Sequence, residues 1–110
     1  MQTALASEVL QLHAQICAGL ADPNRILILY ELAESPRNVT ELSQNLKMTQ
    51  PMTSRHLKVL RERGMVIADR QGTVVLYSLG DHRLIEALDL LRAVLRDSLA
   101  KRAELVEAIS

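Results

Sequence analysis

The stretch that decides the fold of this 110-residue chain is residues 49–64, which reads TQPMTSRHLKVLRERG. Apolar side chains recur along it at helical spacing, with Leu57 and Leu60 three apart. Thr49 is a suitable N-cap, a proline follows it in the first turn, and Gly64 is suited to the position just past a helix end. The stretch therefore predicts a helix from about residue 50 to residue 63.

A second, shorter helix is expected immediately before it. Thr40 precedes residues 41–46, in which Leu42 and Leu46 lie four apart on one helical face. Only Lys47 and Met48 separate this segment from Thr49, so the connection is a tight turn. Two helices joined this closely form a helix-turn-helix, here over about residues 39–63.

The residues after Gly64 change to β character. Residues 65–68 and 73–79 are rich in β-branched side chains, and the polar residues 69–72 between them end in a glycine. This pattern predicts a β-hairpin over about residues 65–79. A hairpin directly after a helix-turn-helix makes the unit a winged helix-turn-helix.

Helices are expected on both sides of this unit. Residues 4–20 form the first, and a second runs from Pro23 to about Glu34 with Asp22 as its N-cap. A long last helix follows Asp81 and continues to about residue 108. Apolar stripes mark the first and last helices: Leu5, Val9, Leu12, Ile16 and Leu20, then Leu84, Leu88, Leu91, Leu95 and Leu99. The predicted fold is mainly α with one small hairpin, in the order ααααββα, as a single domain over residues 1–110.

Composition excludes several classes of protein. The chain is 48% hydrophobic and 24% charged, which suits one globular domain. A single cysteine excludes an internal disulfide framework and a multi-cysteine zinc site. We expect no membrane partner and a cytoplasmic location, because no apolar run approaches the ~20 residues of a span and the first residues lack a signal-peptide pattern. Two tyrosines are the only aromatic residues, which argues against a reader of single-stranded nucleic acid.

Charge is unevenly distributed along a chain whose net charge is zero. Residues 37–72 hold seven basic and three acidic side chains, a net charge of +4, and the remainder carries −4. The positive part coincides with the helix-turn-helix and the hairpin. Because cationic side chains that neutralise phosphates supply most non-specific affinity for DNA, this coincidence favours double-stranded DNA as the partner.

The helix over residues 50–63 is the expected reader of DNA. We predict that its exposed positions include Gln50, Thr53, Ser54, Arg55 and Lys58. Glutamine can pair with adenine and arginine with guanine in the major groove. Arg70 and Gln71 at the hairpin tip are expected to touch an adjacent minor groove or a phosphate. His56 either packs between helices or reaches a phosphate, and for Arg61 and Arg63 phosphate contact and simple solubility remain alternatives.

Several segments resemble the ArsR/SmtB family of repressors. They are LADPNRILIL (residues 20–29), VTEL (39–42), QPMTSRHLKVLR (50–61), GMV (64–66) and GTVVLYSL (72–79), and the likeness runs from about residue 18 to residue 82. The resemblance implies a homodimer that represses an operator and releases it when an inducer binds. It also implies that the first and last helices, about residues 4–20 and 81–108, form the dimer interface. A two-fold dimer would read half-sites of an imperfect palindrome.

The metal ligands of that family are missing from the matching positions. Members that sense arsenic, cadmium or lead carry cysteines at the start of the third helix, where this chain has residues 37–40, RNVT. Zinc and nickel sensors carry an Asp-x-His pair early in the last helix, where Asp81 is followed directly by His82 and no later histidine occurs. Since such metals need thiolate or imidazole ligands, we expect no metal site and no cofactor.

The inducer is left open by the sequence. The alternatives are a thiol-reactive signal through Cys17, an organic ligand between the first and last helices, or no ligand at all. A different function, a winged-helix module that binds proteins and not DNA, is the competing interpretation. An enzyme is not expected, because the chain has no paired catalytic carboxylates and no glycine-rich phosphate loop.

Overall fold

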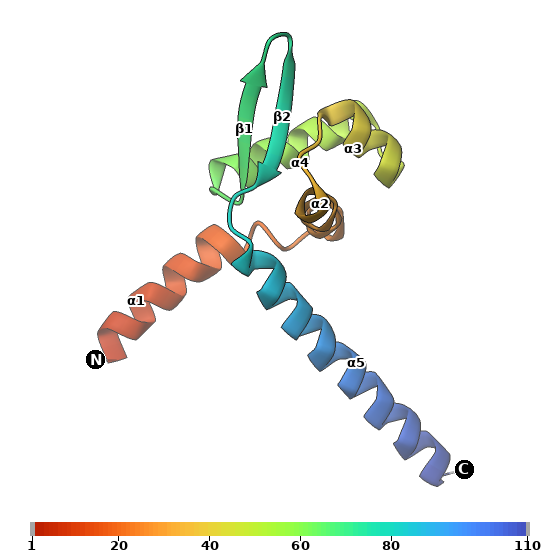
Figure 1. The fold of residues 1–110 in the computed structure, drawn as a ribbon. Coiled ribbons are helices and arrows are strands. Elements are labelled where there is room, and N and C mark those ends of the chain that lie inside the picture. The colour runs from red at the N-terminus through yellow and green to blue at the C-terminus, as the bar shows by residue number, and fades with distance from the viewer. Residues whose placement is uncertain (1, 110) are drawn as a thin grey trace.

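Helix α2 (Pro23–Glu34) lies at the centre of the protein, which is described here from a computed structural model covering residues 2–109. The other elements are α1 (Gln2–Leu12), the π-helical segment η1 (His13–Cys17), α3 (Val39–Leu46), α4 (Gln50–Glu62), β1 (Val66–Gln71), β2 (Val74–Leu79) and α5 (Arg83–Ile109). Helices α3 and α4 and the hairpin lie on one side of α2, while α1 and α5 extend to the other side and diverge (Figure 1). The winged helix-turn-helix fold is confirmed.

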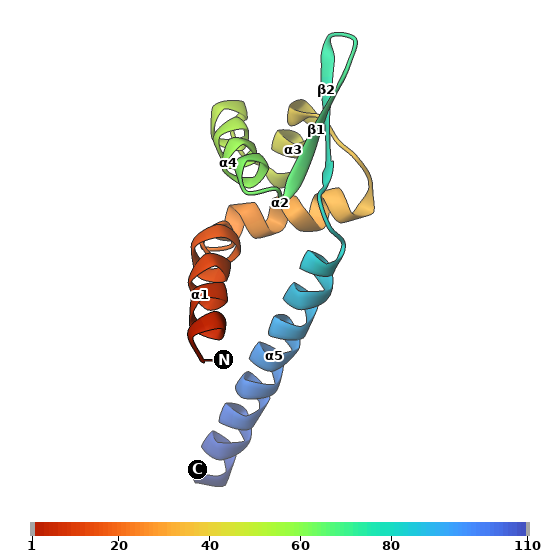
Figure 2. The ribbon, with the colours of Figure 1, turned by 90° about the vertical axis from the view of Figure 1, so that its left-hand side faces the viewer.

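One apolar core joins α2, α3, α4, the base of the hairpin and the start of α5. Its buried side chains are Ile28, Leu29, Leu32, Leu42, Leu57, Leu60, Met65, Val66, Leu79 and Leu88. Only Leu88 comes from the long last helix, so most of α5 lies outside this core. Figure 2 shows α1 and α5 both leaving the body in the direction opposite to the hairpin tip.

Local capping explains where α2, α3 and α4 begin. The Asp22 carboxylate accepts from the amide of Asn24 at 2.8 Å, and the Thr49 hydroxyl accepts from the amide of Met52 at 3.2 Å, as predicted. Helix α3 begins two residues before the predicted Glu41. Asn38 caps it, because Asn38 and Glu41 exchange side-chain-to-backbone hydrogen bonds of 2.8 and 3.0 Å in a capping box.

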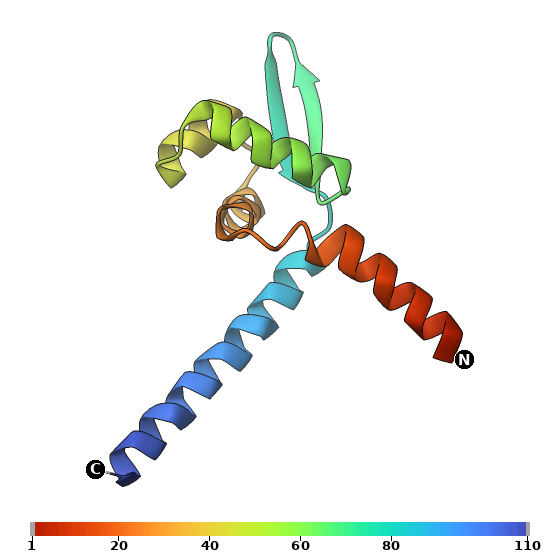
Figure 3. The ribbon, with the colours of Figure 1, turned by 180° about the vertical axis from the view of Figure 1, so that it is seen from behind.

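The hairpin turn is shorter than predicted. Residues 69–71, expected in the turn, continue strand β1, and Gln71 pairs directly with Val74 across a two-residue turn. Gly72 has a φ of +66°, a conformation that closes such turns. The strands are antiparallel, and the tip of the hairpin extends beyond the helices while its base lies beside them (Figure 3).

The first helix is less regular than the predicted single helix over residues 4–20. Its α-helical part ends at Leu12, and η1 continues it with wider π-type turns, in which the amide of Ala18 donates to the carbonyl of His13 at 3.0 Å. The last helix begins at Arg83, whose amide donates to the predicted capping carboxylate of Asp81 at 2.9 Å. No helix within residues 2–109 is long and apolar enough to cross a membrane.

Candidate nucleic-acid interface

Helix α4 has one buried and one exposed side. Thr53, Leu57 and Leu60, at i, i+4 and i+7, face the core. Four predicted reading residues, Gln50, Ser54, Arg55 and Lys58, are exposed on the other side. The exposed side is therefore polar and basic, and the buried side fixes the helix against the rest of the domain. Such a helix can present its side chains to a DNA groove without leaving its own core.

The predicted exposure of Thr53 is wrong. The residue is 0% exposed, and its hydroxyl donates to the carbonyl of Thr49 at 2.8 Å within α4. It lies one turn before Leu57 on the core face, so its side chain cannot reach a base while the domain is folded. The spacing of Thr53 from Leu57 and Leu60 in the sequence is consistent with this buried position.

Gln50 is held by the helix before it. Its amide nitrogen Nε2 donates to the hydroxyl of Thr40 at 3.2 Å, which ties the start of α4 to the start of α3. Both residues are exposed. Thr40 therefore orients a predicted reading residue, a role that no local sequence pattern predicts because the contact joins two helices.

His56 adopts the packing alternative. Its side chain is half-buried, and Nδ1 lies 3.4 Å from Nη1 of Arg25 in α2. The imidazole thus contacts the helix behind α4 and is directed away from the exposed face that holds Arg55 and Lys58.

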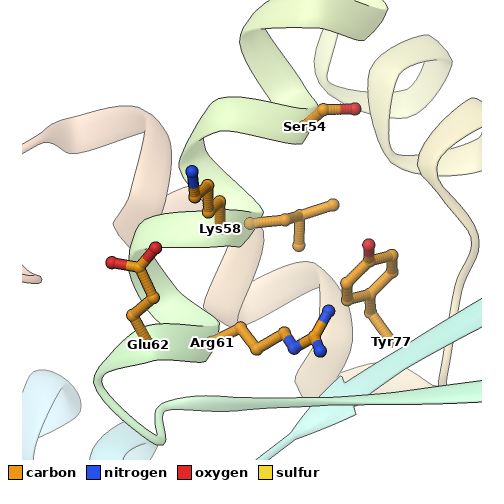
Figure 4. Close-up of a pocket in the computed structure, with 6 residues that line it drawn as sticks. Ser54, Lys58, Arg61, Glu62 and Tyr77 are labelled. Carbon is orange, nitrogen blue, oxygen red and sulfur yellow. The ribbon is translucent and has the colours of Figure 1, made fainter.

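A groove of about 420 Å³ lies between α4 and β2. Its lining residues are Ser54, Leu57, Lys58, Arg61, Glu62 and Tyr77. In Figure 4 the Arg61 guanidinium points toward the Tyr77 ring, while Lys58 and Glu62 lie on the other side of the groove. The cations of Lys58 and Arg61 and the hydroxyls of Ser54 and Tyr77 suit a phosphodiester backbone, whereas the carboxylate of Glu62 would repel one. Tyr77 was not among the predicted site residues.

Tyr77 is fixed by backbone pairing with Arg37. The amide of Tyr77 donates to the carbonyl of Arg37 at 2.8 Å, and the amide of Arg37 donates back at 3.0 Å. The Arg37 side chain pairs with Glu31 at 3.5 Å and Glu34 at 3.4 Å. Arg37 thus anchors the hairpin, and its charge is already compensated by α2.

The other predicted wing residues lie where the hairpin leaves the body. Arg70 and Gln71 are exposed at the end of β1, and Gln71 contacts the Asp69 carboxylate at 3.4 Å. Figure 1 shows the hairpin tip beyond α4 on the same side of the protein. The arrangement suits a helix in one groove and a wing beside it.

The candidate sensor residues are separate from this face. Cys17 is exposed and ends η1. Within residues 2–109 no group of three His, Cys, Asp or Glu side chains is placed to hold a metal ion. Asp81 is instead paired with Arg83 at 2.7 Å, and hydrogen bonds from the Arg83 side chain and backbone lower its pKa to about 2. The donor set does not fit a thiophilic or borderline metal.

The fold and the basic exposed side of α4 are those of a winged helix-turn-helix protein suited to duplex DNA. Comparison with known proteins identifies the family within this class. Residues 22–68 match the family model described as bacterial regulatory protein, arsR family. The chain is 44% identical over 77 residues to the HTH-type transcriptional repressor SmtB of Mycobacterium tuberculosis, a match that covers 70% of this chain and 57% of that repressor. It is 37% identical over 98 residues to the HTH-type transcriptional regulator Rv0081 of the same species, covering 88% and 86%.

Solved structures agree with these relatives. The crystal structure of M. tuberculosis Rv0081 superimposes with a TM-score of 0.76 at 35% identity, covering 86% of this chain and 96% of that one. A homodimeric winged helix-turn-helix DNA-binding domain from Mycobacterium bovis, solved by NMR, gives a TM-score of 0.74 at 26% identity, covering 86% and 87%. The chain belongs to the ArsR family of bacterial regulatory proteins.

Proposed function

We propose that the chain is a homodimeric, sequence-specific DNA-binding regulator that represses transcription from a palindromic operator. One observation carries the proposal: the exposed side of α4 holds Gln50, Ser54, Arg55 and Lys58 while its other side is locked into the core. The repressor name of its relative SmtB supports the direction of regulation.

The chemistry of these side chains gives each a role. Arg55 can bind the O6 and N7 atoms of guanine, and Gln50 can pair with adenine in the major groove. Lys58, Arg61 and the hydroxyl of Tyr77 would meet phosphates along the groove beside α4. Arg70 and Gln71 would contact DNA from the wing. In a two-fold dimer, two α4 helices would lie in successive major grooves about 34 Å apart.

The test is fluorescence anisotropy with the promoter DNA upstream of the protein's own gene. Arg55→Ala should weaken operator binding by about 1–3 kcal/mol and change non-specific binding little, because it removes a base contact. Lys58→Ala should weaken operator binding and non-specific binding alike, because it removes a phosphate contact. It should also reduce the steepness of the plot of log affinity against log salt concentration by about one. Lys101→Ala, which removes an exposed cation from α5 outside its leucine stripe, is the matched control.

Unchanged affinity in both variants would show that α4 does not read DNA. A wild-type protein that binds no DNA at low salt would favour the protein-interaction module instead. A flat salt dependence of any binding would point the same way, since phosphate contacts require a steep one.

The dimer interface we propose consists of the apolar stripes of α1 and α5. Leu5 is 62% exposed in α1, and Leu91 and Leu95 are 61% and 58% exposed in α5. Contiguous apolar faces of this kind are unusual on a monomer and mark interaction sites. The NMR neighbour from M. bovis is described as homodimeric.

Sedimentation equilibrium tests this interface. Leu91→Glu and Leu95→Glu should convert a dimer to a monomer, because each places a charge where an apolar contact is proposed. Val74→Glu alters an equally apolar exposed residue on the hairpin and should leave the dimer intact. A monomeric wild-type protein, or dimeric Glu variants, would contradict the assignment.

The releasing signal we propose is not a metal. The exposure of Cys17 supports thiol oxidation as its form: two Cys17 thiols and one hydrogen peroxide would give one intersubunit disulfide and two water molecules. Peroxide-treated protein should then release DNA and migrate as a linked dimer without reductant, whereas Cys17→Ser should do neither. Equal DNA binding by reduced and treated wild type would exclude this signal and turn attention to organic ligands or regulation without a ligand.

A further inference from the structure

Two arginines from the helix-turn-helix body hold the end of the first helix. Arg63, at the end of α4, donates from Nη1 to the carbonyl oxygens of Ala14 and Gln15. Arg25, in α2, donates from Nε to the carbonyl of Gly19 at 2.8 Å and from Nη2 to the carbonyl of Ala18 at 3.1 Å. We call Arg25 and Arg63 the arginine clamp.

The arginine clamp binds carbonyl groups at the C-terminal end of the first helical segment. The last carbonyls of a helix lack partners within the helix and carry the negative end of its dipole. Ala14 and Gln15 lie in η1, and Ala18 and Gly19 lie in the turn that follows. Guanidinium groups supply several N–H donors and a positive charge, so they satisfy both requirements at once.

Packing brings the same two segments together independently of these hydrogen bonds. Gly19 is buried, and a Cβ atom built on it would lie 2.6 Å from Sδ of Met65 and 3.0 Å from Cδ of Arg63. The turn after η1 therefore packs directly on the junction between α4 and β1. A glycine at this position permits the close approach.

The clamp touches α4 at two points. Arg63 is at its end, and Arg25 reaches its middle through the 3.4 Å contact between Nη1 and Nδ1 of His56. Two separated contacts define the direction of a helix better than one does. The clamp thus holds η1, the turn after it and the axis of α4 in one relative orientation.

We propose that Arg63 and Arg25 are positioning residues that set the spacing at which a dimer reads its two half-sites. The inference rests on the proposed function, because it takes α1 into the dimer interface and α4 into the major groove. Neither arginine needs to touch DNA. Since one base pair moves a half-site by about 3.4 Å and rotates it around the duplex, a rigid link between interface and reading helix makes the protein intolerant of altered spacing.

The experiment compares three duplexes: the operator footprinted in the protein's own promoter, the same half-sites one base pair further apart, and a single half-site. Wild type should bind the altered spacing at least tenfold more weakly than the operator. Arg63→Gln should reduce that ratio to below threefold while its affinity for the single half-site stays within twofold of wild type. Arg63→Lys, which keeps one charged donor, should restore most of the ratio.

One control variant and four possible outcomes separate the alternatives. Arg61→Gln, two residues away, should weaken every duplex by a similar factor and leave the spacing ratio unchanged. A loss of half-site affinity with a smaller salt slope in Arg63→Gln would make Arg63 a phosphate contact and overturn the proposal, as would equal weakening of all duplexes with a lowered Tm. Wild type that binds no operator overturns the proposed function itself. Wild type that binds, with an unchanged spacing ratio in Arg63→Gln, overturns the positioning role alone.

Discussion

The hydroxyl of Tyr30 in α2 donates a 2.6 Å hydrogen bond to Oδ1 of Asp89 in α5. Arg92 lies over the same ring, 5.2 Å from its centroid, and its Nη1 is 3.4 Å from the Tyr30 hydroxyl. Partial burial of the phenol and its bond to Asp89 raise the pKa of Tyr30. Together with the apolar contacts of Leu84, Ile85 and Leu88, this cluster joins the long last helix to the body.

Tyr30→Phe should therefore lower the free energy of unfolding by about 1 kcal/mol, since a hydrogen bond is lost and the ring is kept. Urea unfolding at one fixed protein concentration measures the change. Asp89→Asn and the double variant complete a double-mutant cycle with Tyr30→Phe. The double variant should lose less free energy of unfolding than the two single variants lose together. Additive costs would show that the two groups do not interact in solution.

Thr53 and Ser54 are adjacent in sequence but should respond differently to alanine. Thr53→Ala should lower stability by about 1–2 kcal/mol, because it removes a buried methyl group and the bond to the Thr49 carbonyl. Ser54→Ala should change stability by less than about 0.5 kcal/mol, because the residue is exposed. Thermal unfolding and operator binding of both variants check this. If Thr53→Ala were as stable as wild type but preferred different bases, Thr53 would have to contact DNA, and the buried position would be contradicted.

The parts of the fold that the sequence predicts are those with local signals. Asp22 and Thr49 cap the helices that follow them, and both contacts span no more than three residues. At Thr53 the polar side chain predicts exposure, whereas its spacing of four residues from the buried Leu57 places it on the core side of α4. Residue type alone cannot say which side of an amphipathic helix a threonine occupies.

The parts that the sequence does not predict depend on distant contacts. Arg63 reaches the carbonyl of Gln15 across 48 positions of sequence, and Tyr77 enters the site because its backbone pairs with Arg37. No local sequence pattern at Gln15 or Arg37 predicts these contacts. The π-helical turns of η1 likewise follow no apolar pattern in residues 13–17, where the carbonyls of Ala14 and Gln15 accept from the distant Arg63.

Lys47 forms the tight turn of the helix-turn-helix in the left-handed conformation, with a φ of 54°. A side chain there costs about 1 kcal/mol relative to glycine, so Lys47→Gly should raise the free energy of unfolding by about 0.5–1 kcal/mol. Lys47→Ala is the matched control, because it removes the same charge and keeps a Cβ atom. Urea unfolding of both variants should rank glycine above alanine. An alanine variant as stable as the glycine variant would mean that charge, and not backbone conformation, governs the position.

Acid should leave the start of α5 intact to unusually low pH. The Arg83 side chain and then its backbone amide donate to Asp81, which lowers the pKa of that carboxyl from 3.8 to about 2. A carboxyl group whose pKa is lowered by folding stabilises the fold at any pH above its ordinary pKa, and this contribution is lost as the pH falls from about 3.8 through about 2.

An NMR titration of the Asp81 carboxyl should therefore show it still ionised at pH 3. Arg83→Ala removes the side-chain donors and leaves the amide, so the pKa of Asp81 should rise part of the way toward 3.8. Titration of wild-type Asp81 at its ordinary value would show that the pair does not persist in solution.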